Sequence, residues 1–333
     1  MENGLTFEKI LSFNLQEGWM SQKLYQLLLY FYREFHRALK GQKVFPEASF
    51  HSLLSLIKEQ HLTPFTFQPY HEKVRSPFDY YSFGNDLFRF LMDEKNSKIV
   101  GRIYIKGILS LLEKGENVIF FSNHQTEGDP QILSLLLDAS YPGFAENIIF
   151  VAGERVTTDP LAIPFSMGRN LICIYSKRYI HHPPEKKIEK RQHNKKAMIL
   201  MSRLLKEGGK CIYVAPSGGR DRRNSLGKVE VAPFDPKSIE MFYLMAKKSK
   251  TPTHFYPMSL FTYDLLPPPE TIQAELGEIR SVKRGAAHLA VGSAIDMERF
   301  PGYDLEEKRL CRQARATYIW ELVVSNYQSL VSL

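Results

Sequence analysis

The sequence predicts an α/β protein in which a small helical N-terminal domain precedes a larger α/β domain with a mostly parallel, mixed sheet. Two observations lead to this fold class. Near the N-terminus, apolar residues recur at three- and four-residue steps, as in amphipathic helices. After residue 77, short apolar runs alternate with helical stretches, and this alternation favours a sheet covered by helices on both faces.

The N-terminal domain is expected to contain two helices. The first covers residues 21–40, and the second lies around residues 53–57. Residues 63–69 carry two prolines and no helical period, so we place a linker there. The predicted domains are therefore residues 1–68 and residues 69–333.

The larger domain is expected to alternate strands and helices along the chain. The predicted strands are residues 117–121, 147–152, 171–175, 210–214 and 253–260, and residues 285–291 could add late strands. The predicted helices are residues 131–138, 185–206, 238–248 and 305–330. In an open α/β sheet, ligands usually bind at the carboxyl ends of the strands, so the loops that follow the strands are the first place to look for chemistry.

Composition indicates a soluble globular protein from a reducing compartment. Hydrophobic residues make up 44% of the chain, which suffices for a sizeable core. No apolar run reaches the roughly 18 residues of a membrane-spanning helix, and the N-terminus does not resemble a secretory or transit signal. Cys173, Cys211 and Cys311 are widely separated and show no zinc-ligand spacing, so we expect no metal site and buried, unreactive thiols at the first two.

The net charge of +8 favours an anionic partner. Nucleic acid, a phosphorylated metabolite, an anionic membrane and an acidic carrier protein all satisfy this condition. The predicted helix over residues 185–206 concentrates lysines and arginines between residues 186 and 196, which form either a solvated face or a docking surface for an acidic partner. A nucleic-acid-binding module is the rival class, but the chain lacks a recognisable binding motif, and its basic residues do not form one stripe.

The loop over residues 121–130 places a histidine and an aspartate five residues apart between a predicted strand and a predicted helix. His124 is a candidate general base because a neutral imidazole exists near pH 7. Asp129 could orient that ring and stabilise the imidazolium, provided that the loop curls back, which Gly128 would permit. Asp129 also suits the helix N-cap, with Pro130 in the first turn. In the alternative interpretation, Asp129 is only a cap and His124 an ordinary loop histidine.

Two further loops after predicted strands are suited to an anion. Residues 214–223 contain two glycines together with Arg220 and Arg222, whose planar guanidinium groups can bind a phosphate. Residues 175–179 add Lys177 and Arg178 after another strand. A solvated basic turn is the alternative for either loop. Together, three such loops at one predicted sheet edge indicate an anionic substrate beside His124.

Several blocks of the sequence resemble one family. Asn123–Pro130 (Asn-His-Gln-Thr-Glu-Gly-Asp-Pro) is similar to the H-x-x-x-x-D block of glycerolipid acyltransferases. Residues 69–71, 77–81, 151–156, 164–171 and 215–222 resemble the soluble, plastid-type glycerol-3-phosphate acyltransferases. The resemblance extends from about residue 66 to at least residue 292.

This resemblance implies a reaction and roles for individual residues. The implied activity transfers a fatty acyl group from acyl-acyl carrier protein, or from acyl-coenzyme A, to the sn-1 hydroxyl of glycerol 3-phosphate. His124 matches the catalytic histidine and Asp129 its partner, while Arg220 and Arg222 match arginines that hold the substrate phosphate. Lys177, Arg178 and Tyr179 stand where the family has a basic pair and a histidine. Tyr179 therefore replaces an imidazole by a phenol.

The resemblance also bears on partners and location. It implies glycerol 3-phosphate and a thioester donor as partners, no metal or other cofactor, no nucleic acid, and a possible peripheral membrane contact for product release. Without a recognisable transit peptide, we expect a bacterial cytoplasmic enzyme, with the plastid stroma as the alternative for a mature chain. An acyltransferase for another phosphorylated acceptor, such as lysophosphatidate, is the second enzyme candidate.

Overall fold

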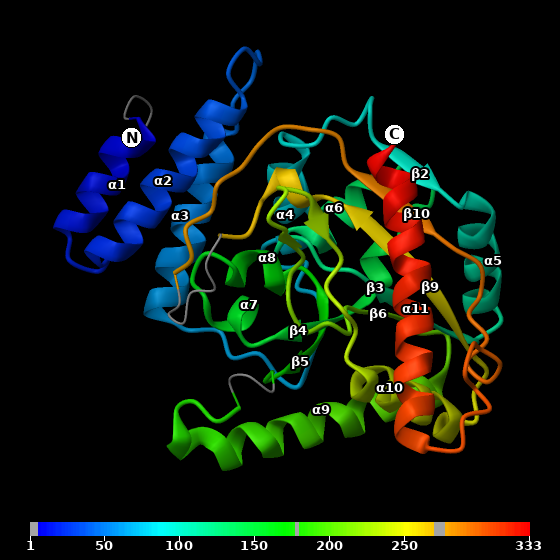
Figure 1. The fold of residues 1–333 in the computed structure, drawn as a ribbon. Helices are drawn as coiled ribbons and strands as arrows, with labels where there is room; N and C mark the ends of the chain where they lie inside the picture. Colours follow the sequence, from blue (N-terminus) through cyan, green and yellow to red (C-terminus); the bar gives the residue numbers. More distant parts are fainter. Residues whose placement is uncertain (1–5, 177–179, 270–276) are drawn as a thin grey trace.

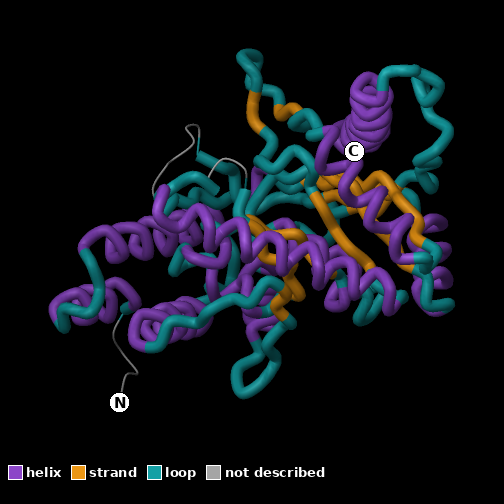
Figure 2. The backbone as a smooth tube through the Cα atoms, turned by 90° about the horizontal axis from the view of Figure 1, so that it is seen from below, coloured by secondary structure: helices purple, strands orange, loops and turns teal. Residues whose placement is uncertain are grey.

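The computed structural model describes residues 6–176, 180–269 and 277–333 (Figure 1). The N-terminal helices lie at one side of the molecule, and the long C-terminal helix lies at the other side in both views (Figures 1 and 2). In the described part of the chain, no helix is long and apolar enough to cross a membrane.

The N-terminal unit consists of α1 (Phe7–Gln16), α2 (Gln22–Ala38) and α3 (Glu47–Leu62). The rings of Phe7, Phe35 and Phe50 are fully buried between these helices, with Phe35 and Phe50 in edge-to-face contact at a centroid distance of 5.1 Å. The two predicted helices match α2 and α3, while α1 was not predicted. Buried residues of these helices belong to the same apolar cluster as one face of the sheet, and the division into two domains at residue 68 stays a prediction.

The described residues form an eight-stranded sheet with the order β1-β5-β4-β6-β3-β9-β10-β2. Its strands are β1 (Tyr70–His71), β2 (Lys98–Val100), β3 (Asn117–Ser122), β4 (Ile149–Gly153), β5 (Asn170–Ile174), β6 (Cys211–Val214), β9 (Thr253–Phe261) and β10 (His288–Val291). Strands β5, β4, β6, β3 and β9 run parallel, whereas β1 and β10 are antiparallel to their neighbours β5 and β9. The predicted mostly parallel, mixed sheet is confirmed.

Helices cover both faces of this sheet (Figure 1). One face packs on α4 (Tyr80–Arg89), α5 (Arg102–Glu113) and α6 (Asp129–Asp138), and the other on α9 (Lys187–Glu207), α10 (Pro236–Ser249) and α11 (Lys308–Val331). Strand β3 shows the two-residue period that makes this possible, because Val118 and Phe120 enter one cluster and Ile119 and Phe121 the other. Short helices α7 (Arg155–Thr158) and α8 (Ile163–Met167) connect β4 to β5, and a hairpin of β7 (Arg222–Arg223) and β8 (Val229–Glu230) follows β6.

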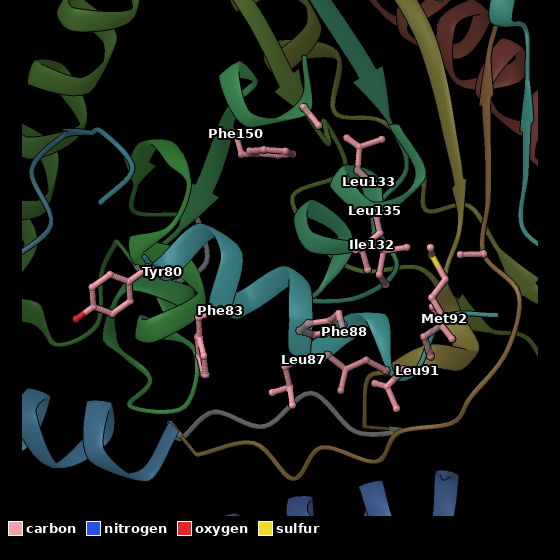
Figure 3. Packing of buried hydrophobic residues seen from close by; sticks show 14 of the residues in the cluster. Tyr80, Phe83, Leu87, Phe88, Leu91, Met92, Ile132, Leu133, Leu135 and Phe150 are labelled. Carbon is pink, nitrogen blue, oxygen red and sulfur yellow. The ribbon is translucent and has the colours of Figure 1, made fainter. Parts of the chain in front are cut away.

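Helix α4 packs directly on α6, the helix that begins at the candidate site. Figure 3 shows Leu87 and Phe88 of α4, with Leu91 just after its end, beside Ile132 and Leu135 of α6, and all of these side chains are buried. Neither α4 nor α5 was predicted. The packing fixes the start of α6, and therefore the loop that leads into it.

Candidate active site

The loop between β3 and α6 brings His124 and Asp129 into contact. Nδ1 of His124 lies 2.8 Å from Oδ2 of Asp129. The carboxylate is almost completely buried, whereas the imidazole is about one-third exposed, with 32% of its side-chain surface accessible. The pair therefore has one member fixed inside the protein and one member that a substrate can reach.

Asp129 accepts hydrogen bonds from several donors besides His124. The backbone N–H groups of Gln125 and Thr126 donate to the carboxylate at 2.8 and 3.2 Å, and the hydroxyl of Thr262 donates at 2.6 Å. A carboxylate surrounded by donors acts as an acceptor, so Nδ1 of His124 carries the proton and donates it. Nε2 then presents its lone pair, and it has no hydrogen-bond partner among the described residues. This tautomer is the one that a general base requires.

The predicted N-cap at Asp129 was wrong by one position. Helix α6 begins at Asp129, Gly128 occupies the N-cap, and Pro130 follows in the first turn. No side chain caps this helix; instead, the Asp129 carboxylate turns back into the preceding loop. The physical reason is that the loop N–H groups and His124 together offer more hydrogen bonds than the free amides of the helix end.

Gly128 is needed for a reason different from the predicted one. Its φ of −87° is ordinary, so the turn does not demand a glycine. A Cβ built at this position would lie 2.2 Å from Cε1 of Phe88, a buried ring on α4. The close approach of α4 to the loop, and not backbone flexibility, therefore excludes a side chain at residue 128.

Arg220 does approach the histidine loop, by which we mean residues 123–129 around His124 and Asp129, but this arginine is already paired with carboxylates. One of its terminal nitrogens donates to both carboxylate oxygens of Glu278 at 2.6 and 2.8 Å, and the other lies 3.8 Å from Glu127 in the histidine loop. Arg155 adds a second cation 3.6 Å from Glu278. Arg220 thus lies beside the histidine loop, and the carboxylate of Glu278 contacts both Arg220 and Arg155.

A buried arginine links this cluster to the rest of the site. Arg280 contacts Glu127 at 2.8 Å and Asp159 at 3.2 Å. Burial alone would raise the pKa of Asp159, but the Arg280 guanidinium and the N–H groups of Leu161 and Gly277 together outweigh burial and hold the pKa below its usual range. Asp159 and Arg280 therefore stay ionised, and their ion pair helps to hold the segment that begins at Gly277 beside the histidine loop.

The other predicted phosphate ligands are placed less directly. A terminal nitrogen of Arg222 donates to the carbonyl of Pro269, and its side chain is half-buried at the start of β7. Lys177, Arg178 and Tyr179 lie outside the described residues. The chain reaches them from β5, which is parallel to β4 and shares the carboxyl edge of the sheet with β3.

Sequence reasoning missed the residues that hold the histidine loop in place. The side chains of Asn123 and Gln125 accept hydrogen bonds from the backbone of Leu260 and Thr262 at 2.8 and 2.7 Å, where β9 ends. Asn123 and Gln125 were assigned no role from the sequence, although both belong to the block of residues 123–130. Only their position next to His124 indicated that they could matter for the site. No feature of the sequence linked Glu278 and Arg280 to the site, because they lie more than 150 residues after His124 in the chain.

A histidine with a free ring nitrogen, held by a buried aspartate beside arginines at the carboxyl edge of an α/β sheet, is an arrangement suited to base-assisted group transfer. The family model "Acyltransferase" matches residues 103–297, more than half of the chain and all of the described site up to Arg280. The chain belongs to the acyltransferase family.

Several curated proteins are similar to this chain. "Glycerol-3-phosphate acyltransferase, chloroplastic" of Arabidopsis thaliana is 42% identical over 270 residues, which cover 81% of this chain and 59% of that protein. "Glycerol-3-phosphate acyltransferase ATS11, chloroplastic" of Cucurbita moschata is 45% identical over 236 residues, which cover 71% of this chain and 53% of that protein. The matched part thus spans between half and three fifths of these relatives.

A solved structure is also similar over most of both chains. The 1-acyl-sn-glycerophosphate (LPA) acyltransferase PlsC from Thermotoga maritima aligns with a TM-score of 0.42 and 17% identity, covering 92% of this chain and 97% of that chain. A similarity of this size does not bear on the fold or on the substrate.

Proposed function

We propose that this protein is a glycerol-3-phosphate 1-O-acyltransferase, which forms lysophosphatidate from glycerol 3-phosphate and an acyl thioester. The observation that carries the proposal is the contact between His124 Nδ1 and Asp129 Oδ2, which leaves Nε2 free as a base. The names and the 42% and 45% identities of the relatives support glycerol 3-phosphate as the acceptor. A lysophosphatidate acyltransferase is the alternative within the same family.

The proposed mechanism is direct acyl transfer. Nε2 of His124 takes the proton of the sn-1 hydroxyl as its oxygen attacks the thioester carbonyl, and Asp129 stabilises the imidazolium. The carbon–sulfur bond breaks, and the imidazolium gives its proton to the departing thiolate. Because a thiolate is a good leaving group, we propose that the reaction uses no cofactor besides the acyl donor.

Binding of the phosphate would position the hydroxyl at Nε2. We propose Arg220 and Arg222 as ligands of the phosphate, with Lys177 and Arg178 as further candidates and Tyr179 in place of the family's histidine. Planar guanidinium groups match phosphate geometry, and a fixed substrate reacts far faster than one that must be captured from solution. Arg220→Ala should therefore raise the KM for glycerol 3-phosphate more than it lowers kcat; an unchanged KM would remove Arg220 from the phosphate site.

The decisive assay uses radiolabelled glycerol 3-phosphate with acyl-acyl carrier protein and with acyl-coenzyme A. Formation of labelled lysophosphatidate with either donor supports the proposal. Absence of product with both donors, together with acylation of lysophosphatidate, would favour the alternative acceptor. Because these relatives are chloroplastic proteins, we propose the plastid stroma, and not a bacterial cytoplasm, as the place of action.

We further propose that α9 docks an acidic carrier protein. Arg191, Lys195 and Lys196 are exposed on this helix, whereas Lys190 is buried and pairs with Glu154 at 3.3 Å. Ile188 is 71% exposed on the same helix, so an apolar contact is available among the cations. Lys190, which was grouped from the sequence with the basic residues of this helix, is therefore not part of the proposed surface.

Charge reversal tests this surface. Lys195→Glu with Lys196→Glu should raise the KM for acyl-acyl carrier protein several-fold while that for acyl-coenzyme A changes little, because only the protein donor needs the docking surface. Lys40→Glu with Lys43→Glu, two exposed lysines between α2 and α3, is the matched control. Equal effects on the two donors would contradict docking on α9.

A peripheral membrane contact for product release is proposed at the start of α5. Ile103 is 72% exposed and lies next to exposed Val100 and Tyr104, with Lys98 and Arg102 beside them. Exposed apolar side chains flanked by cations suit an anionic lipid surface. Ile103→Glu should reduce sedimentation with phosphatidylglycerol vesicles without lowering activity towards soluble substrates; unchanged sedimentation would exclude this contact.

A further inference from the structure

Asp221 lies between the two candidate phosphate ligands and is completely buried, with 0% of its surface exposed. Its neighbours Arg220 and Arg222 direct their side chains to Glu278 and to the carbonyl of Pro269. Asp221 instead contacts the histidine loop. Three consecutive residues therefore serve two different parts of the site.

Both the backbone and the side chain of Asp221 bind the histidine loop. Its N–H donates to the carbonyl oxygen of His124 at 2.6 Å. Its Oδ2 accepts from Nδ2 of Asn123 at 2.9 Å and from Nε2 of Gln125 at 3.2 Å, the residues on either side of His124. Its Oδ1 accepts from the N–H of Ala232 at 3.0 Å, after the β7–β8 hairpin. Asp221 thus binds residues 123–125 by hydrogen bonds from one side, while the backbone at the end of β9 binds them from the other.

Within the described part of the chain, the carboxylate has no cation to pair with. Among the described residues, its hydrogen-bond donors are all neutral amides, and no lysine or arginine lies within ion-pair distance of it. Burial raises the pKa of Asp221 to about 6, above the ordinary value of 3.8. A buried carboxylate without a cation costs free energy that a neutral side chain would avoid. What it provides here is an acceptor with several lone pairs that can bind three donors at once.

We propose that Asp221 is a positioning residue that fixes His124 at a set distance from the phosphate ligands Arg220 and Arg222. The proposal rests on the proposed function, because the distance matters only if one substrate spans both groups. A phosphate held by the arginines and a hydroxyl presented to Nε2 belong to the same small molecule. A shift of about 1 Å between the two loops can therefore cost on the order of 100-fold in rate, even when binding is intact.

Asp221→Asn is the first test. The amide keeps the shape but has only one acceptor oxygen, so an NH2 group faces either the donors of Asn123 and Gln125 or the N–H of Ala232, and the link between the two segments is broken. We expect kcat for glycerol 3-phosphate to fall by about 100-fold, while calorimetric titration gives a Kd within threefold of the native value. Asp264→Asn, at an exposed residue after β9 that pairs with Arg223, is the matched control and should keep kcat.

The stoichiometry of the titration separates positioning from folding. If Asp221 only supports the fold, the number of binding sites per chain will fall in proportion to kcat. If it positions His124, the stoichiometry stays near one while kcat falls. Full stoichiometry with kcat within threefold of the native protein would overturn the proposal, and so would a proportional loss of both.

Gln125→Glu tests the same contact from the other side. It keeps the acceptor for the N–H groups of Thr262 and Tyr263 but places a carboxylate oxygen against Oδ2 of Asp221. We expect a similar loss of kcat with binding retained. Combining it with Asp221→Asn restores one donor–acceptor pair, so the double variant should be more active than either single variant. Additive losses would contradict the inferred contact.

Failure of this inference is distinguishable from failure of the proposed function. If the native chain neither binds glycerol 3-phosphate nor produces lysophosphatidate, the proposed function is wrong. If the native chain does both and the Asp221→Asn variant does so equally well, only the positioning role is wrong.

Discussion

The guanidinium of Arg220, which we propose as a phosphate ligand, donates to both carboxylate oxygens of Glu278, at 2.6 and 2.8 Å. The side chain of Glu278 is only 4% exposed, so the pair is well shielded from solvent. An anionic carboxylate and an anionic phosphate compete for one cation. In the proposed binding mode, the substrate phosphate would therefore displace Glu278 or share Arg220 with it.

Glu278→Gln should lower the KM for glycerol 3-phosphate. Removing the negative charge leaves Arg220 and Arg155 with less compensation, which favours a phosphate dianion. We expect a decrease of roughly three- to tenfold, corresponding to about 1 kcal/mol of binding free energy. Steady-state kinetics with glycerol 3-phosphate as the varied substrate would measure it.

Glu298→Gln, an exposed residue paired with Lys247, is the control and should leave the KM unchanged. A higher KM in Glu278→Gln would mean that the carboxylate orients Arg220 instead of competing with the substrate. In that case Glu278 belongs to the binding site as a support of the arginine.

His124→Ala should abolish most of the turnover and leave substrate binding intact. The imidazole presents the lone pair of Nε2 to the substrate side of the loop in the proposed mechanism, and general-base assistance of this kind contributes about 10²–10⁴-fold. The measurement is kcat together with the Kd for glycerol 3-phosphate by calorimetry. A variant that keeps native kcat would exclude the proposed mechanism.

Asp129→Asn should lower kcat about as much, by roughly 10²–10⁴-fold. The amide can donate to Nδ1, which would move the proton of His124 to Nε2 and remove the base. Nitrogen-15 NMR of the labelled His124 ring would show the change of tautomer directly. An Asp86→Asn variant, exposed on α4, is the control, and a native tautomer with lost activity would point to a different role for Asp129.

The central strands could be predicted from sequence because strands buried on both faces are continuous apolar runs. Strand β3 is such a run, and it was predicted to within one residue of its end. Helix α4 was missed, since its sequence contains glycine, serine and asparagine and its apolar residues include large aromatics. Packing on α6 and an N-cap hydrogen bond from the N–H of Ser82 to Asp79 stabilise it. The two-residue strand β1 depends wholly on pairing with β5.

The candidate site could be predicted only in its local part. His124 and Asp129 lie in one short loop, so spacing alone made their contact plausible. The partners of Arg220 and Asp221 are set by how distant segments meet, as with Glu278, and no local pattern encodes such a meeting. For Gly128, the sequence indicated a special position, but the reason for it is a ring 40 residues earlier, Phe88.

The raised pKa of Asp221, about 6, predicts a pH-dependent cost to stability. The native state holds this proton more tightly than the unfolded chain, so protonation stabilises the native protein at low pH, and that contribution is lost as the pH rises through about 6. The difference in unfolding free energy between the native protein and Asp221→Asn should therefore shift by about 2–3 kcal/mol between pH 4 and pH 7.5, to the disadvantage of the native protein.

Urea unfolding of both proteins at the two pH values measures this shift. Among the residues that the structure describes, the titratable groups that interact with or lie near Asp221 are His124 and Asp129 in the histidine loop, Tyr213 on β6 and Tyr327 on α11. They are present in both proteins, so most of their own titration cancels in the difference. A difference that stays constant from pH 4 to pH 7.5 would show that the carboxyl is not perturbed by burial.

Gly128→Ala should damage the site through a single contact. The backbone at residue 128 accepts alanine, with φ at −87°, but the new methyl group would lie 2.2 Å from the ring of Phe88. Overpacking of this kind costs about 1–3 kcal/mol of stability, and relief requires either the ring or the histidine loop to move. We therefore expect a lower unfolding free energy and, because the loop carries both His124 and Asp129, a lower kcat.

Phe88→Leu in the same chain should reverse much of both losses. Leucine lacks the ring atoms that meet the methyl group, so the loop can return to its native position, while Phe88→Leu alone should lose stability by opening a cavity between α4 and α6. A double-mutant cycle on unfolding free energy and on kcat measures the coupling. Positive coupling in both would show that the packing of α4 sets the geometry of the histidine loop. If stability recovered and kcat did not, residue 128 would act on His124 by a route other than the Phe88 ring.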